Sequence, residues 1–127
     1  MRVVALDHVV LAVSDIERSV SWYTALLDVK VERLEEWRAG DAPFVSLRLD
    51  AATLIDLLEV DGRDAPQLSV DHVALVVEGV DLSALAARGD LEVEMGPVRL
   101  WGARGWGEGV YLRDPDRNRI EIRTYGE

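Results

Sequence analysis

The 127-residue chain has no cysteine. Disulfide bonds, thiolate nucleophiles and zinc–thiolate sites are therefore excluded together, and this composition suits a reducing compartment. Basic residues are also few, because 14 Lys and Arg stand against 24 Asp and Glu, giving a formal net charge of −10. No cluster of Lys or Arg occurs along the chain, so we do not expect a nucleic-acid partner.

Long apolar runs are missing as well. No segment approaches the ~20 consecutive apolar residues that a membrane-spanning helix needs. Met1 is followed by strand-like sequence rather than by the basic and apolar regions of a signal peptide. We therefore expect a soluble cytoplasmic protein with no membrane partner, of a length that suits about one domain.

Histidine occurs only twice, and both copies have the same setting. His8 is the third residue of LDHVVLAV (6–13), and His72 is the third residue of VDHVALVV (70–77). Side-chain alternation in a strand places the two histidines at equivalent positions, opposite the more apolar face. One such histidine is usually a core residue that hydrogen-bonds a carbonyl, but two at equivalent positions favour metal binding or catalysis.

The chain repeats one pattern around these two strands. Each is followed by a helical segment, residues 14–27 in the first half and 79–89 in the second. Ser14 and Glu17 have capping-box spacing, and Asp81 is placed to cap the second helix. Three strand-like runs then follow each helix: 29–37, 44–50 and 52–60, and later 91–96, 109–114 and 119–124.

This order predicts an α+β fold made of two βαβββ modules in tandem. The first module covers about residues 1–62 and the second about 69–127, divided near the polar stretch 61–69, within one domain of residues 1–127. Helices on one side leave the other face of each mixed sheet uncovered. We expect these faces to curve around a shared metal-binding cavity that contains both histidines.

The last strand-like run provides a carboxylate. In DPDRNRIEIRTY (114–125), Ile120 and Ile122 face one way, so Glu121 faces the other way together with two arginines. The residues alone leave two interpretations of Glu121 open. In one it is a metal ligand, and in the other it belongs to an exposed edge with surface salt bridges.

Three stretches, LDHVVLAVSDIERSVSWYTALLDVKV, VDHVALVV and YLRDPDRNRIEI, together resemble the vicinal oxygen chelate superfamily. This superfamily includes glyoxalase I, bleomycin and fosfomycin resistance proteins, methylmalonyl-CoA epimerase and extradiol dioxygenases. The resemblance covers essentially the whole chain and implies a metal bound by His8, His72 and Glu121, in a homodimer. Two imidazoles and a carboxylate suit one divalent ion, whether Fe, Mn, Ni, Co or Zn.

The resemblance also implies a fourth ligand position, which Asp56 occupies here. Asp56 shares a strand face with Leu54 and Leu58. Three roles stay open for it: a metal ligand, a base beside the metal, or a solvated carboxylate on a frayed edge. With Asp56 or Glu121 as base, the resemblance implies glyoxalase-like or epimerase-like lyase or isomerase chemistry on a substrate chelated through vicinal oxygens.

Other family activities remain as alternatives. Tyr111 matches a site tyrosine of ring-cleaving dioxygenases, but the nearby region 99–109 lacks the further histidine that those enzymes use. Fosfomycin-modifying relatives carry a threonine where this chain has Val10. A non-catalytic small-molecule (drug) binding or resistance protein is also possible in this family, although such proteins usually lack the metal-binding set.

Residues 99–109, RLWGARGWGEG, have the most unusual composition in the chain. One interpretation is a mobile lid, in which Trp101 or Trp106 stacks on a planar substrate and Arg104 pairs with an anionic group. The other is a flexible hairpin whose tryptophans pack on a neighbour.

The turn at residues 114–118 departs from the family pattern. It reads DPDRN where relatives have DPDGN, so it lacks the glycine that adopts a positive φ at little cost. We expect Asn118 to adopt the left-handed conformation instead, or the turn to change type.

Overall fold

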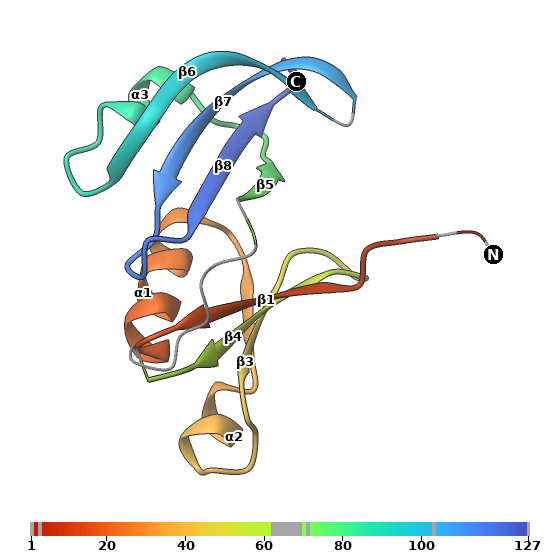
Figure 1. Ribbon diagram of the computed structural model, residues 1–127, viewed down its shortest axis with the longest axis vertical. Helices are drawn as coiled ribbons and strands as arrows, with labels where there is room; N and C mark the ends of the chain where they lie inside the picture. The colour runs from red at the N-terminus through yellow and green to blue at the C-terminus, as the bar shows by residue number, and fades with distance from the viewer. Residues whose placement is uncertain (1, 3, 62–69, 71, 103, 127) are drawn as a thin grey trace. The chain divides into compact units, whose positions relative to one another are not determined.

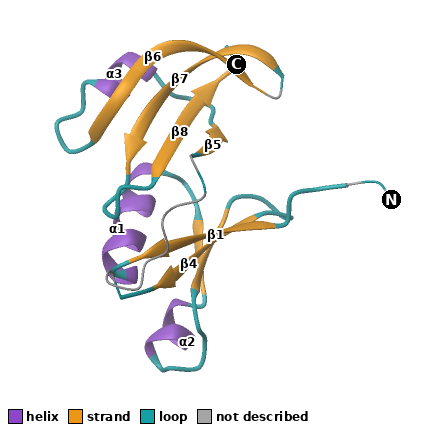
Figure 2. Ribbon diagram, in the orientation of Figure 1, coloured by secondary structure: helices purple, strands orange, loops and turns teal. Residues whose placement is uncertain are grey.

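The computed structural model describes residues 2, 4–61, 70, 72–102 and 104–126 (Figure 1). The chain divides into two compact units, Met1–Pro66 and Gln67–Glu127. Most of the stretch expected to divide the modules, 62–69, lies outside the described residues. Each unit has one four-stranded sheet and its own helical segments (Figure 2). The prediction of an α+β fold with two βαβββ modules in tandem is confirmed.

The first unit has a sheet of order β1-β4-β3-β2. Strands β1 and β4 pair in parallel, whereas β4 with β3 and β3 with β2 pair antiparallel. Both β4 and β3 are therefore inner strands. The elements are β1 (His8–Val13), α1 (Ile16–Leu26), β2 (Lys30–Glu32), α2 (Leu34–Arg38), β3 (Val45–Arg48) and β4 (Leu54–Glu59).

The prediction of a strand over 29–37 is correct only for its first part. Only Lys30–Glu32 is extended, and α2 begins at Leu34. Arg33, between them, adopts the left-handed conformation with φ 71°, which ends an extended strand. A short helix therefore lies between the second and third strands of the first module.

The second unit repeats the first connectivity with a sheet of order β5-β8-β7-β6. Strands β5 and β8 are parallel, and β8 with β7 and β7 with β6 are antiparallel. Its elements are β5 (Val73–Val76), α3 (Leu82–Ala86), β6 (Glu92–Gly102), β7 (Gly105–Arg113) and β8 (Arg119–Thr124). None of the described helices has the length and apolar character needed to cross a membrane.

Each sheet buries one face beneath its helix. Alternation along the inner strands puts apolar side chains on that face, and each fully buried aliphatic side chain stabilises the fold by roughly 1.5–3 kcal/mol. Asp56 and Glu121 alternate with these residues and so lie on the opposite face of their sheets. The core residues are Leu11, Val13, Ile16, Val20, Tyr23, Ala42, Val45, Leu47, Ile55 and Leu57 in the first unit, and Leu82, Leu85, Val110, Leu112, Ile120 and Ile122 in the second.

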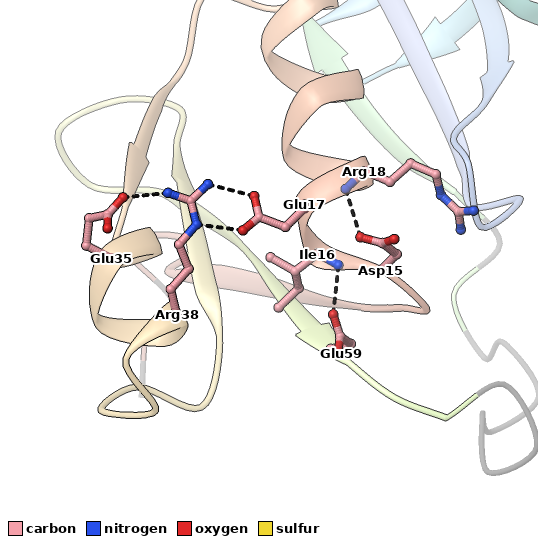
Figure 3. A network of polar contacts seen from close by, with 7 residues as sticks. All are labelled: Asp15, Ile16, Glu17, Arg18, Glu35, Arg38 and Glu59. Atoms are coloured by element: carbon pink, nitrogen blue, oxygen red, sulfur yellow. Dashed lines mark hydrogen bonds and ion pairs between the residues drawn. The ribbon is translucent and has the colours of Figure 1, made fainter.

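The N-terminus of α1 is held by two carboxylates (Figure 3). The N-cap is Asp15, whose side chain accepts a hydrogen bond from the Arg18 backbone N–H at 3.0 Å. Glu59, at the end of β4, accepts the Ile16 N–H at 3.0 Å and so ties the helix to the sheet. The predicted cap at Ser14 is wrong by one residue, because the Ser14 hydroxyl instead accepts a hydrogen bond from the Arg18 guanidinium at 2.7 Å.

Arg38 joins α2 to α1. Its Nε and Nη2 donate to the two carboxylate oxygens of Glu17 at 2.6 and 2.8 Å, and its Nη1 donates to Glu35 at 2.6 Å (Figure 3). The hydrogen bond with Arg38 lowers the pKa of Glu17, and the hydrogen bond with Glu17 raises the pKa of Arg38. Glu17 thus connects two helices instead of completing a capping box.

In the turn between β7 and β8, Asn118 does not adopt the expected left-handed conformation. Arg117, which stands where the family has glycine, adopts the positive φ of 70°. Asp114 accepts hydrogen bonds from the backbone N–H groups of Asp116 and Asn118 at 2.9 and 2.8 Å, and from the Asn118 side-chain amide at 2.8 Å. Because these bonds hold Asn118 in place, the residue before it takes the left-handed conformation.

Candidate functional site

His8, at the start of β1, is oriented by the residue that precedes it. The imidazole Nδ1 lies 2.7 Å from Oδ2 of Asp7. This hydrogen bond raises the pKa of His8, and the negative charge of Asp56 acts in the same direction. When Nδ1 donates to Asp7, the lone pair is on Nε2, which is the nitrogen then available to a metal ion.

Asp56 is buried in β4, between β1 and β3. Only 4% of its surface is exposed, and its Oδ1 accepts a hydrogen bond from Ser46 Oγ at 2.6 Å. Ser46 is its register partner on β3. Of the three roles considered for Asp56, the solvated carboxylate on a frayed edge is wrong, because β4 is an inner strand and the carboxylate is buried and hydrogen-bonded.

His72 and Glu121 lie together in the second unit. The Nε2 atom of His72, which comes just before β5, is 3.2 Å from Oε2 of Glu121 in β8. The other oxygen of Glu121, Oε1, accepts a hydrogen bond from Arg123 Nη1 at 2.8 Å. An arginine does pair with Glu121, but the pair is buried on an inner strand rather than placed on an exposed edge.

Within each unit, a carboxylate takes the same register position relative to the histidine. Asp56 is the register partner of Val10, two residues beyond His8. Glu121 is the register partner of Ala74, two residues beyond His72. Parallel pairing of the first and fourth strands of each module therefore places a carboxylate at the same register position relative to the histidine in both units.

Tyr111 belongs to the group around His72. It is the register partner of Glu121 on β7, and its ring meets the His72 imidazole edge-on with 5.4 Å between centroids. The Arg119 guanidinium lies 5.5 Å from the centre of the same ring. The second unit thus brings three of the predicted site residues, His72, Tyr111 and Glu121, into one group.

The tryptophan-rich segment is a pair of strands rather than a loop. Strand β6 extends to Gly102 and β7 begins at Gly105, so the segment forms the two paired strands of a hairpin. Trp101 and Trp106 are opposite each other, with 5.4 Å between ring centroids and exposed fractions of 69% and 53%. Residue 103, at the turn, lies outside the described residues.

Arginines stack on the aromatic rings of this segment. Arg99 lies 4.2 Å over Trp106, and Arg104 lies 4.5 Å over Tyr125. Tyr125 also accepts a hydrogen bond from the Arg104 backbone N–H at 3.1 Å. We call these residues the hairpin cluster: Arg99, Trp101, Arg104, Trp106 and Tyr125.

Sequence reasoning missed four residues around the predicted site. Asp7 could have been found, because an acidic residue directly precedes His8 and can reach its ring. The others are recognised only through strand register or stacking, which a single sequence does not show. The missed residues are Asp7, Ser46, Arg99 and Tyr125. Arg123 was expected beside Glu121 from strand alternation, but its bonds to the Leu100 and Trp101 carbonyls were not.

The spacing of His72 and Glu121 suits two ligands of one divalent ion. Two ligand atoms at roughly 2.0–2.1 Å from a tetrahedral ion are about 3.3 Å apart, and His72 Nε2 and Glu121 Oε2 are 3.2 Å apart. His8 Nδ1 is hydrogen-bonded to Asp7, so Nε2 is the nitrogen that can coordinate an ion. Among the described residues, no three His, Asp or Glu side chains gather as a metal site, and the predicted set takes ligands from both units.

Comparisons with known proteins cover both modules. Residues 5–122 match the family model described as the Glyoxalase/Bleomycin resistance protein/Dioxygenase superfamily. Virulence protein STM3117 of Salmonella typhimurium is 27% identical over an alignment of 127 positions that covers 94% of this chain and 83% of that protein.

Solved structures agree with this match. An integron cassette protein from the mobile metagenome of V. cholerae has a TM-score of 0.76 at 27% identity, over 99% of this chain and 98% of that one. TnmS3, an antibiotic binding protein from Streptomyces sp. CB03234, has a TM-score of 0.67 at 20% identity, over 99% of both chains. At that identity, the second likeness shows the fold alone.

Proposed function

Because the chain belongs to the Glyoxalase/Bleomycin resistance protein/Dioxygenase superfamily, we propose that it is a divalent-metal-dependent enzyme. Its substrate is a small molecule chelated through two vicinal oxygens, and its chemistry is that of a glyoxalase-like or epimerase-like lyase or isomerase. The ion, which is Fe, Mn, Ni, Co or Zn, is held by His8, His72 and Glu121. The observation that carries the proposal is the 3.2 Å separation of His72 Nε2 and Glu121 Oε2.

The equivalent pair in the first unit supports this proposal. His8 is oriented by Asp7, and Asp56 is on the neighbouring strand in the same register as Glu121 in its own unit. Outer carboxylates that hydrogen-bond a ligating imidazole commonly fix its orientation in metal sites. Each unit thus contributes donors of the types that these divalent ions bind.

A bound ion supplies electrophilic stabilisation of the negative charge that develops on the substrate oxygens. Asp56 is the side chain that we assign to proton transfer, or to ligation as a fourth donor. Ser46 engages its Oδ1, so Oδ2 is the oxygen that takes or returns the proton. Glu121 is the second candidate base, but both of its oxygens already have close partners, Arg123 and His72.

The rest of the substrate contacts the second unit in this proposal. Tyr111 stands beside His72, and the exposed rings of Trp101 and Trp106 provide stacking surface for a planar group. Arg104 offers a positive charge to an anionic group on a chain whose net charge is −10.

The experiment is metal analysis of protein purified without chelators, followed by activity screens with 1,2-dicarbonyl, 2-hydroxy-acid and catechol compounds. We expect about one ion per chain in the wild type and loss of stoichiometric metal in His8→Ala and in His72→Ala. Glu94→Gln is the matched control, because Glu94 pairs with Arg113 and Arg119 in the same sheet as Glu121. Unchanged metal content in both histidine variants would refute the proposal.

A non-catalytic small-molecule (drug) binding or resistance protein is the second candidate. The exposed pair Trp101 and Trp106 favours it, because stacking surface alone suffices to capture a planar ligand. Binding of planar aromatic compounds that is unchanged by removal of metal, without turnover, would support this candidate. Dioxygen consumption with catechols would instead favour the ring-cleaving alternative, with Tyr111 beside His72.

The proposed working form is a cytoplasmic homodimer. Strands β1 and β2 are the edges of the first sheet, and β5 and β6 are the edges of the second. Edge strands present unpaired backbone groups that pairing with a second copy can cover. Light scattering should give about twice the chain mass, and a monomer at micromolar concentration would contradict this part of the proposal.

A further inference from the structure

Arg123 is a buried arginine on β8 that contacts the proposed ligand Glu121. Its side chain is 4% exposed, and its Nη1 donates to Glu121 Oε1 at 2.8 Å. The guanidinium also lies 4.6 Å from the centre of the Tyr125 ring. A buried ion pair is weak evidence of added stability, because desolvation offsets the attraction between the charges. The contacts of Arg123 are better explained by what they position.

The two oxygens of Glu121 have different partners. Arg123 engages Oε1, and Oε2 lies 3.2 Å from His72 Nε2. A carboxylate held in this way cannot rotate without losing a charge-assisted hydrogen bond. One oxygen is therefore kept beside the histidine, as ligation through a single oxygen requires.

Two glycines of β7 leave the space for this arrangement. A Cβ atom at Gly109 would lie 3.2 Å from Glu121 Oε1 and 3.4 Å from Arg123 Cβ. A Cβ atom at Gly107 would lie 3.1 Å from Arg123 Nη2. Gly107 and Gly109 thus make room for the Arg123–Glu121 pair.

Arg123 also holds the backbone of the hairpin cluster. Its Nη2 donates to the Leu100 carbonyl at 3.1 Å, and its Nη1 donates to the Trp101 carbonyl at 3.3 Å. One guanidinium therefore connects the strand end that carries Trp101 with the carboxylate beside His72. The planar group of arginine can reach all three acceptors at once, which the single ammonium of lysine cannot do.

We propose that Arg123 is a positioning residue that presents Oε2 of Glu121 to the metal and connects this carboxylate to the hairpin cluster. The inference rests on the proposed function in one respect, namely that Glu121 is a metal ligand. It assigns Arg123 no contact with the metal or the substrate. Its effect on both passes through Glu121 and through the carbonyls of Leu100 and Trp101.

The test is the substitution Arg123→Lys, which keeps the positive charge and removes the forked geometry. Binding of Mn²⁺ and Co²⁺ is measured by titration calorimetry, and the visible spectrum of the Co²⁺ form reports ligand geometry. We expect Kd to rise about tenfold and the Co²⁺ spectrum to change, as losses of partners around metal ligands usually do. The control is Arg113→Lys, an arginine of the same sheet that pairs with Glu94, for which Kd should stay unchanged.

A second measurement needs no metal. Hydrogen exchange of peptides covering residues 99–109 should be about tenfold faster in Arg123→Lys than in the wild type, and unchanged in Arg113→Lys, because Arg123 donates to the Leu100 and Trp101 carbonyls whereas Arg113 pairs with Glu94. Unchanged exchange would overturn the connection to the hairpin cluster.

The outcomes separate the two proposals. A wild-type protein that binds no divalent ion overturns the proposed function, and with it the presentation of Glu121 to a metal. A wild type that binds the ion, with Arg123→Lys binding within twofold of it, overturns only the positioning role. A lower unfolding temperature with unchanged Kd and spectrum also overturns it, because that is the result of a merely structural residue.

Discussion

His72 Nε2 lies 3.2 Å from Glu121 Oε2, while the other oxygen of Glu121 is held by Arg123. The two residues are far apart in the chain and meet because β5 and β8 pair in parallel. The same pairing of β1 with β4 places Asp56 on the strand next to His8. The repeated module therefore gives both carboxylates the same register relative to the histidine of the neighbouring strand.

The substitution Asp56→Asn tests the assigned base. Asparagine keeps the shape and can still accept the hydrogen bond from Ser46, so the unfolding temperature should change little. It cannot take up the proton, so turnover of any substrate found in the screens should fall by at least ~100-fold. Ser46→Ala is the control, because it removes the partner and leaves the carboxylate, and its turnover should fall less. Turnover of Asp56→Asn within tenfold of the wild type would contradict the assignment.

Gly107→Ala tests whether the tryptophan segment is tightly packed. The added Cβ would lie 2.6 Å from the Thr124 carbonyl oxygen in β8, where the backbone cannot move away cheaply. We expect a loss of about 1–3 kcal/mol in the free energy of unfolding, measured in urea. At Gly89, a Cβ would meet nothing within 4 Å. Gly89→Ala, the control, should therefore change the free energy of unfolding by less than about 0.5 kcal/mol. Equal effects of the two substitutions would show that the segment is loosely packed.

Much of the fold could be predicted because alternating apolar residues mark the strands directly. Leu11 and Val13, and likewise Ile120 and Ile122, are buried on the face that the alternation indicated. The prediction failed over 29–37, where the left-handed Arg33 ends the strand and no residue type signals it. It also chose Ser14 as the helix cap although Asp15, an equally suitable residue, takes that position.

The candidate site was predictable only as a set of residue types. The repeated histidines and the terminal-strand carboxylate are visible in the sequence, as is Asp56 through the family resemblance. The contact of Ser46 with Asp56 depends on strand register, and the contacts of Arg123 with Glu121 and with the Leu100 and Trp101 carbonyls depend on side-chain reach. Those contacts decide which carboxylate oxygen is engaged, so the chemistry of the site could not be derived from spacing alone.

Arg117 offers a test of backbone strain in the turn after β7. Its φ is 70°, a conformation that costs a residue with a Cβ roughly 1–2 kcal/mol and glycine almost nothing. Arg117→Gly and Arg117→Ala both remove the ion pair with Glu92, so they differ in the backbone alone. Glycine also loses more conformational entropy on folding than alanine does, which offsets part of this gain. The glycine variant should therefore be more stable than the alanine variant by about 0.5–1 kcal/mol in urea unfolding. A more stable alanine variant would refute the positive φ.

The ion pair between Glu17 and Arg38 predicts a pH dependence of stability. Arg38 lowers the pKa of Glu17 in the folded protein below its ordinary value of 4.5. The unfolded chain therefore binds this proton more readily, so the pair stabilises the fold fully above about pH 4.5, and the contribution is lost as the pH falls through the lower folded pKa. Glu17→Gln should unfold at a lower temperature than the wild type at pH 7. The difference should shrink below about pH 4.5 and vanish in stronger acid.

Glu36→Gln is the control for this series, because both substitutions remove one negative charge from a chain of net charge −10. Glu36 is exposed on α2, and no ion pair is found for it within the described part of the chain. Its substitution should therefore relieve general repulsion without losing a specific partner. Unfolding temperatures followed by circular dichroism from pH 7 to pH 2.5 distinguish the two effects. If Glu17→Gln and Glu36→Gln follow the same curve, the contact that joins α2 to α1 contributes no stability of its own, and screening by solvent has cancelled it.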